Sequence, residues 1–176
     1  MRAPRGLCHP TPIMSTAFLE LADPDATLAA GARLAPDLCP GMIVTLSGDL
    51  GAGKTTLVRG CLRKMGWTGA VKSPTYTLVE YYPFSSIYFY HFDFYRFADP
   101  SEWDTAGLAD CFRDDSICMV EWPERVGSAL PSPDLALTLA HHVDPTMPGR
   151  QLTLRAQSKA GERCLNAIIT APARTT

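Results

Sequence analysis

The stretch that decides the fold runs Gly48-Asp49-Leu50-Gly51-Ala52-Gly53-Lys54-Thr55 and matches the pattern G-x-x-x-x-G-K-[ST]. Glycines let such a loop turn tightly and point several backbone N–H groups inward, where they bind phosphate oxygens. Lys54 supplies a positive charge that can reach the β- and γ-phosphates, and the Thr55 hydroxyl can replace a water in a Mg²⁺ shell. The pattern therefore predicts a phosphate-binding loop (P-loop).

Both flanks of this loop are of the kind that the motif requires. Residues 42–46 form a short apolar run with β-branched residues, which predicts a strand buried on both faces. The following segment predicts a helix that ends at Gly66, with one apolar stripe made of Leu57, Val58, Cys61, Leu62 and Met65. A chance match would occur in roughly one chain of this size in a hundred, and this context makes chance a poorer explanation.

The expected cofactors are ATP and Mg²⁺. The expected nucleotide contacts are the loop, the start of the following helix and one aromatic residue, namely Asp49, Leu50, Gly51, Ala52, Gly53, Lys54, Thr55, Thr56 and Trp122. For Trp122 the residues alone leave open whether the ring packs on the nucleotide, on a partner or in the core.

Two acidic residues end apolar runs that predict strands. They are Asp93 and Glu121. Strands of an open α/β sheet end at the ligand crevice, and a P-loop enzyme needs one carboxylate for the metal and one group to orient water. We expect these two acids, with Thr55, to form the metal shell, although spacing alone does not say which acid orients water. The alternative is that they are strand-end acids paired with Arg96 or Arg125.

A polar segment after the P-loop helix contains Ser73, Pro74 and Thr75. Pro74 favours extended geometry at Ser73, and segments in this position often act as switches whose hydroxyl groups sense the γ-phosphate and Mg²⁺. A plain turn leading into a strand explains the same residues equally well. His91, close to Asp93, is compatible with a ligand, with a base and with a buried core histidine.

The order of elements predicts a single-domain α/β fold of the P-loop NTPase type, with a mixed parallel and antiparallel central sheet. Further strands are expected at residues 76–82, 87–92, 117–120, 135–139 and 151–154, and further helices at residues 24–35, 100–112 and 123–130. We expect the ATPase domain to span residues 16–157. Residues 1–15 would then be a disordered extension or a misassigned start, and residues 158–176 a C-terminal strand or tail.

Composition excludes several other classes. The 16 basic and 18 acidic residues give a net charge of −2, so no general basic field indicates nucleic-acid binding, although a local patch that contacts RNA stays open. The six cysteines form no CxxC pair and no metal-ligand spacing, which favours reduced thiols in a cytoplasmic protein. The sequence also lacks an apolar run of the ~20 residues that span a bilayer.

Taken together, the motifs resemble those of the TsaE (YjeE) family, the ATPase of the bacterial tRNA threonylcarbamoyladenosine pathway. The similarity covers roughly Leu21 to Leu154. It rests on the P-loop through Thr56 and on four further segments: Ser73-Pro74-Thr75-Tyr76-Thr77-Leu78, His91-Phe92-Asp93-Phe94-Tyr95-Arg96, Glu121-Trp122 and Gly149-Arg150. The loop between Tyr82 and Ile87 is shorter than is usual in the family.

This resemblance implies ATP hydrolysis in support of tRNA threonylcarbamoylation. It also implies two partner proteins, the catalytic transferase subunit and its inactive relative. Carried over by motif, Lys54 and Thr55 would bind phosphates and Mg²⁺, Thr75 would be the switch hydroxyl, and Asp93 would belong to the metal shell. Glu121 would orient water, with Lys54 as the second catalytic residue.

Three other classes of P-loop protein fit the sequence less well or no better. A small-molecule kinase usually carries an arginine-rich lid, but the 12 arginines here are scattered. A GTPase would normally carry an Asn-Lys-x-Asp guanine reader, which the sequence lacks. A nucleotide-gated assembly module with negligible turnover would share every sequence feature with the ATPase.

Overall fold

The computed structural model describes residues 15–99, 102–142 and 148–170. Its seven-stranded sheet has the order β1-β7-β6-β2-β5-β4-β3. The strands are β1 (Ser15–Leu21), β2 (Ile43–Ser47), β3 (Val79–Pro83), β4 (Tyr88–Asp93), β5 (Ser116–Glu121), β6 (Leu135–His141) and β7 (Arg150–Ala156). The α-helices are α1 (Pro24–Leu34), α2 (Lys54–Lys64), α3 (Glu102–Thr105) and α4 (Lys159–Thr170). This arrangement confirms the predicted α/β fold with a mixed sheet.

The P-loop strand β2 lies in the middle of the sheet, parallel to both β5 and β6. Its Val44 and Leu46 side chains are fully buried, as the apolar run predicts for a central strand. Strand β4 continues the parallel set beside β5, whereas β3, β7 and β1 join by antiparallel pairing. The carboxyl ends of β2, β4 and β5 therefore meet at one edge of the sheet.

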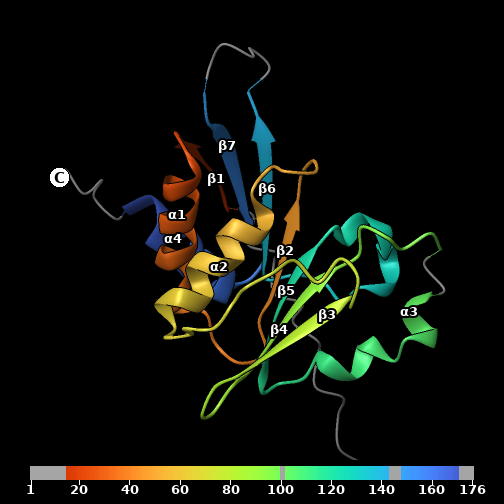
Figure 1. Cartoon of the computed structure of the whole chain (residues 1–176). Coiled ribbons are helices and arrows are strands. Elements are labelled where there is room, and N and C mark those ends of the chain that lie inside the picture. Colours follow the sequence, from red (N-terminus) through yellow and green to blue (C-terminus); the bar gives the residue numbers. More distant parts are fainter. Residues whose placement is uncertain (1–14, 100–101, 143–147, 171–176) are drawn as a thin grey trace, which may run out of the picture.

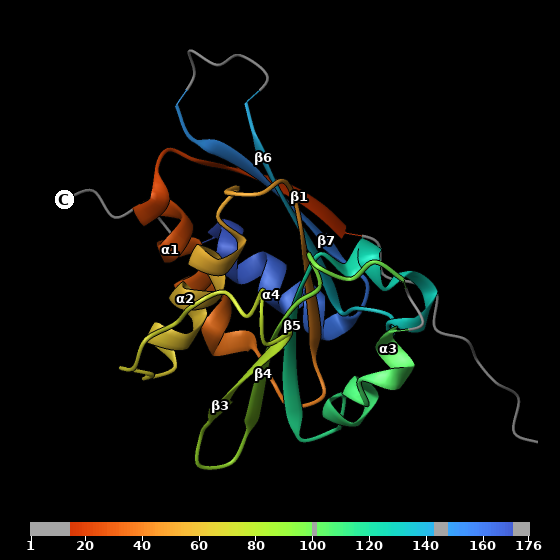
Figure 2. The same ribbon diagram turned by 45° about the vertical axis from the view of Figure 1, so that its right-hand side comes forward.

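Three helices cover one face of the sheet, with α1 and α2 side by side and α4 behind them (Figures 1 and 2). Two glycines allow α1 and α2 to touch backbone to backbone. A Cβ atom at Gly31 would lie 2.0 Å from the carbonyl oxygen of Leu57, and one at Gly60 would lie 2.1 Å from that of Leu28. The helix that carries the P-loop is thus held directly by α1.

On the opposite face, the described residues cover the β2–β5–β4 part of the sheet. Helix α3 and the 3₁₀ turns near it lie there, apart from the other helices (Figure 1). They enclose a second, aromatic-rich core made of Phe92, Phe94, Phe97, Trp103, Leu108, Cys118, Val120 and Val126. Side chains of β4 point alternately to the two faces of the sheet, so Phe89 lies in the larger core and Phe92, three residues later, lies in the smaller one.

Several sequence predictions need correction. The C-terminal segment is the helix α4 rather than a strand or tail, because Gly161, Cys164, Leu165 and Ile168 make an apolar stripe that packs on the sheet. The domain therefore continues well past residue 157. Strand β1 was not predicted at all. It lies at the sheet edge, where its Phe18 side chain is 65% exposed, and only alternate residues face the core.

The predicted helix at residues 100–112 is interrupted. Within its described part, α3 ends at Thr105 and a 3₁₀ turn at Leu108–Cys111 follows, because Gly107 adopts a left-handed φ of 65°. The segment at residues 123–130 forms two 3₁₀ turns, Pro123–Arg125 and Gly127–Ala129, rather than one helix. The predicted strand at residues 76–82 begins only at Val79, after a turn, and it pairs antiparallel with β4 across the short loop.

The predicted extension at residues 1–15 lies outside the described residues except for Ser15, which begins β1. Among the described helices, none is both long and apolar enough to cross a membrane.

Candidate nucleotide site

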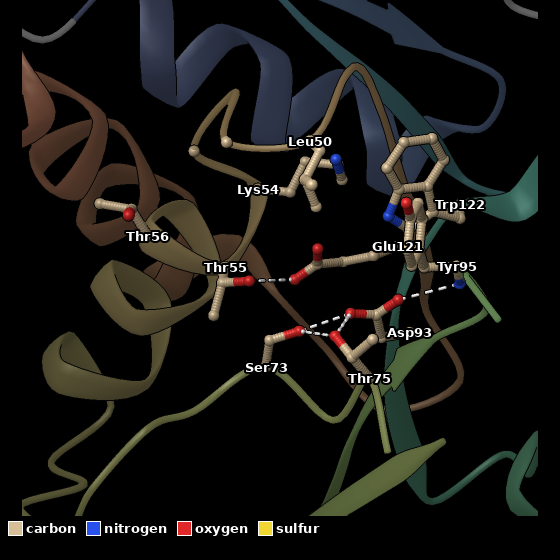
Figure 3. Close-up of a pocket in the computed structure, with 12 residues that line it drawn as sticks. Leu50, Lys54, Thr55, Thr56, Ser73, Thr75, Asp93, Tyr95, Glu121 and Trp122 are labelled. Atoms are coloured by element: carbon tan, nitrogen blue, oxygen red, sulfur yellow. Dashed lines mark hydrogen bonds between the residues drawn. The ribbon is translucent and has the colours of Figure 1, made fainter. Parts of the chain in front are cut away.

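A cavity of about 270 Å³ opens at the edge of the sheet where β2, β4 and β5 end (Figure 3). It is lined by residues of the P-loop and α2, of the polar segment before β3, and of the ends of β4 and β5. These are Leu50, Gly51, Gly53, Lys54, Thr55, Thr56, Ser73, Thr75, Asp93, Tyr95, Glu121 and Trp122. Segments far apart in the sequence thus supply one continuous wall.

The P-loop backbone takes a shape that only glycine allows at low cost. Gly51 and Gly53 have φ values of 79° and 103°, in the left-handed region that side chains disfavour. Helix α2 begins at Lys54, directly after the turn, so the free N–H groups of its first turn lie at the cavity wall. This end of the helix favours an anion.

Lys54 is the buried cation of the site, with only 4% of its surface exposed. Its Nζ atom donates to the carbonyl oxygens of Gly48 at 2.6 Å and Asp49 at 2.9 Å. The same atom lies 4.1 Å from the centre of the Trp122 ring. Burial lowers the pKa of Lys54, while the carboxylates around it, led by that of Glu121, oppose the shift.

Glu121 connects the P-loop to the end of β5. Its Oε1 atom accepts a hydrogen bond from the Thr55 hydroxyl at 2.8 Å and lies 2.8 Å from Nε2 of His91. The carboxylate is 3% exposed, and in Figure 3 its second oxygen points toward Lys54 and the P-loop. A carboxylate in contact with the P-loop hydroxyl is the arrangement that holds Mg²⁺ in P-loop NTPases.

Asp93 lies opposite Glu121 in the parallel register of β4 and β5. Its Oδ2 atom accepts hydrogen bonds from the hydroxyl groups of Ser73 and Thr75, the latter at 2.6 Å. Its Oδ1 atom accepts from the backbone N–H of Tyr95 at 3.0 Å. Asp93 therefore ties the polar segment before β3 to the sheet edge, where Figure 3 shows the three side chains converging.

Trp122 leaves the end of β5 in an unusual conformation. Its φ of 58° is left-handed, which is uncommon for a large side chain. The turn places its ring against Tyr95, with ring centres 5.1 Å apart, as well as against Lys54. Backbone strain of this kind persists where the surrounding contacts fix it, and it often marks a functional site.

The donor set of the cavity fits Mg²⁺ bound with a nucleotide. A hydroxyl and two carboxylates, which are hard oxygen ligands, are brought together at a helix N-terminus beside the P-loop and the Lys54 ammonium. Within the described ranges no cluster of three or more His, Cys, Asp or Glu side chains could hold a metal alone.

Comparison with known proteins agrees with these features. Residues 21–151 match the family described as "Threonylcarbamoyl adenosine biosynthesis protein TsaE". The chain belongs to the TsaE family.

Relatives from distant bacteria support this membership. The TsaE protein of Haemophilus influenzae is 46% identical over 127 residues, which cover 72% of this chain and 78% of that protein. The Bacillus subtilis protein is 38% identical over 117 residues, covering 66% and 73%. A crystal structure of YdiB from Bacillus subtilis matches with a TM-score of 0.73 at 27% identity, covering 90% of this chain and 97% of that one.

In this TsaE chain most of the residues singled out in the sequence line the one cavity. Asp49 and Ala52 are the exceptions among the expected nucleotide contacts. Ala52 is fully buried, and its carbonyl oxygen accepts a hydrogen bond from Nη1 of Arg150 at 2.6 Å.

Three features of the TsaE site were not predicted. They are the ring of Tyr95 in the cavity wall, the contact of Arg150 with the P-loop and the contact of His91 with Glu121. Tyr95, Arg150 and His91 each lie within a motif quoted above, and this position is the sequence signal that points to them. No local pattern indicates that partners 98 and 30 residues away meet.

Proposed function

We propose that this protein binds and hydrolyses ATP in a Mg²⁺-dependent reaction that supports N6-threonylcarbamoyladenosine modification of tRNA. Membership of the TsaE family supports the pathway. The observation that carries the chemistry is the contact between Thr55 and Glu121 at the start of α2. This contact places a hydroxyl and a carboxylate, both groups that bind Mg²⁺, next to a loop whose backbone can bind phosphates.

The side chains divide the work by position. Lys54, whose ammonium now donates to the carbonyl oxygens of Gly48 and Asp49, would bind the phosphate oxygens and offset developing charge there. Thr55 and Glu121 would hold the Mg²⁺, with Asp93 as a further member of the metal shell. When bound, Mg²⁺ neutralises charge on the β- and γ-phosphates.

In this proposal, a carboxylate at the end of a strand orients the water that attacks the γ-phosphate. Glu121 has one oxygen engaged by Thr55 and a second that points toward the P-loop, so it is our first choice for this role. Asp93 has both oxygens occupied, by Ser73 and Thr75 on one side and by the N–H of Tyr95 on the other. Asp93 therefore couples the site to the polar segment.

Ser73 and Thr75 form the switch in this proposal. Their hydroxyl groups compete with Mg²⁺ for Oδ2 of Asp93, so metal binding would release or reorder the segment. Trp122 and Tyr95 close the cavity beside Lys54 and pack against the nucleotide. A partner that contacts the exposed switch residue Tyr76, which is 82% exposed, would sense this change.

The partners we propose are the catalytic subunit of the threonylcarbamoyl transferase and its inactive relative, in the cytoplasm. This part of the proposal rests on the family resemblance of the motifs. A small-molecule kinase remains the competing function, and the phosphate acceptor distinguishes the two.

The test is phosphate release from Mg–ATP by the purified chain, alone and with the two partner proteins and tRNA. We expect slow basal release that rises when the partners are added. A rate of phosphate release that does not change when the partners are added would contradict the pathway role. ATP loss that requires a small hydroxyl substrate would establish the kinase instead.

A further inference from the structure

We propose that His91 is a positioning residue that holds the Glu121 carboxylate in the orientation needed for metal binding and turnover. This inference rests on the proposed function, since it assigns Glu121 to the ATP reaction. His91 itself does not line the cavity and is fully buried. It can therefore act only through the side chain that it contacts.

The topology of the sheet brings the two residues together. His91 lies two residues before Asp93 on β4, so both side chains project from the same face of that strand. Asp93 is directly opposite Glu121 on β5, and His91 is opposite Met119, one pleat deeper in the sheet. Nε2 of His91 reaches Oε1 of Glu121 at 2.8 Å, although His91 does not line the cavity.

The unpaired ring nitrogen defines the protonation pattern of this contact. Nδ1 of His91 is buried and has no hydrogen-bond partner among the described residues. An ionised carboxylate only accepts, so Nε2 must carry the proton. A proton on Nδ1 as well would leave a buried donor unsatisfied, which is costly. The geometry therefore favours the tautomer in which Nε2–H donates to Glu121.

The two donors on Oε1 have different fates in the reaction. The Thr55 hydroxyl would join the proposed metal shell and change its surroundings when Mg–ATP binds. His91 is fully buried and would keep its hydrogen bond to Oε1 in that state. With Oε1 held by His91, the other oxygen of Glu121 would stay directed toward the P-loop, as Figure 3 shows it. Partners of this kind commonly set the orientation and strength of metal-binding side chains.

The test compares three variants of the full chain. His91→Leu removes the donor, and His91→Gln offers an amide N–H at a similar reach. Phe89→Leu is the matched control, because Phe89 is equally buried on the same face of β4 but contacts Tyr82 and Phe84 instead of the site. Thermal unfolding first establishes that each variant is folded.

For His91→Leu we expect the turnover number to fall about tenfold or more and the half-saturating Mg²⁺ concentration to rise, as for a lost hydrogen bond to a charged group. Affinity for ATP measured in EDTA should change by less than about threefold, since the P-loop is untouched. His91→Gln should restore most of the turnover, and Phe89→Leu should match the wild type. Wild-type turnover and Mg²⁺ requirement in folded His91→Leu would overturn the proposal.

A spectroscopic measurement separates this proposal from the proposed function. In ¹⁵N-histidine NMR of the wild type, the signals that disappear in His91→Leu should show a protonated Nε2 and an unprotonated Nδ1. The opposite tautomer would overturn the positioning role. If the wild type released no phosphate under any condition, the ATPase proposal would fail, while this spectrum and the Mg²⁺ dependence of nucleotide binding would still decide the role of His91.

Discussion

The hydroxyl group of Thr55 lies 2.8 Å from Oε1 of Glu121, although 66 residues separate them in the chain. Thr55 is fixed by the first turn of α2, and Glu121 by the last position of the fully buried strand β5. Neither side chain can move far without disturbing the core. For the proposed binding of Mg–ATP, the side chains of the site are therefore largely in place beforehand, which would lower the free-energy cost of binding.

Glu121→Gln and Asp93→Asn should separate the two carboxylates. We expect Glu121→Gln to lower Mg²⁺-dependent turnover by about 100-fold or more, while ATP affinity in EDTA stays within about threefold. Asp93→Asn should instead loosen the segment held by Ser73 and Thr75, seen as faster protease cleavage there. Titration and phosphate release with both variants check this. Loss of turnover in Asp93→Asn alone would exchange the roles.

Lys54→Ala should weaken Mg–ATP binding by about 10- to 100-fold, because a charge-assisted contact to phosphate is lost. The variant should remain folded, since removing the ammonium also removes a buried charge whose pKa is lowered by desolvation. Lys64→Ala is the control, because Lys64 is an exposed residue in the last turn of the same helix. Calorimetric titration gives the affinities. Unchanged affinity in Lys54→Ala would remove the P-loop assignment.

Arg150→Met should reduce nucleotide affinity without touching the cavity. The Arg150 guanidinium holds the carbonyl oxygen of Ala52 from the far side of the loop. Losing it should cost about 1 to 2 kcal/mol of ATP binding, because the loop is no longer fixed in its bound shape. Arg155→Met, at an exposed position of the same strand, is the control. Equal affinities for the two variants would show that the loop does not depend on Arg150.

Gly31→Ala should destabilise the fold by about 2 kcal/mol or more. Replacing glycine by alanine inside a helix normally stabilises it by roughly 1 kcal/mol, so the expected sign is reversed. The reason is that the new Cβ atom would lie 2.0 Å from the carbonyl oxygen of Leu57 and push α1 away from α2. Urea unfolding measures the change. A stabilised variant would mean that the two helices are not in backbone contact.

Stability should fall as the pH rises above about 9. Burial raises the pKa of the Cys118 and Cys164 thiols to about 12, and raises that of Cys61 further. Between about pH 9 and 12 the unfolded chain therefore loses thiol protons that the folded chain keeps, which favours unfolding. Urea midpoints from pH 7 to 10 check this. Cys61→Ala should show a shallower decline than the wild type, and an equal or steeper decline would contradict the assignment.

Local sequence patterns were sufficient for the centre of the molecule. The apolar run of β2, the glycines of the loop and the stripe of α2 are all contiguous, so their period and composition specify them. The carboxylates Asp93 and Glu121 could be predicted for the same reason, because each ends a strand. Parallel strands of an α/β sheet end at the same edge, and this general rule predicts that the two carboxylates share one cavity.

The remaining parts depend on partners that are distant in sequence. Strand β1 forms only because β7 offers a pairing edge, and the two are separated by most of the chain. Helix α4 has an apolar period of its own, but it lies beyond the segment that the family motifs cover. Arg150 and His91 lie within quoted motifs, but the partners that they contact are set by the tertiary structure and not by a local pattern.

Because of the glycine contacts between them, α1 and α2 should move as one rigid unit. Since Gly31 and Gly60 seat backbone on backbone, α1 cannot slide or tilt independently of α2 without a steric clash. If phosphate binding displaced the first turn of α2, α1 would therefore be displaced with it, and the movement would reach the surface of the molecule. A probe on the exposed side of α1 would report events in a cavity that it never touches.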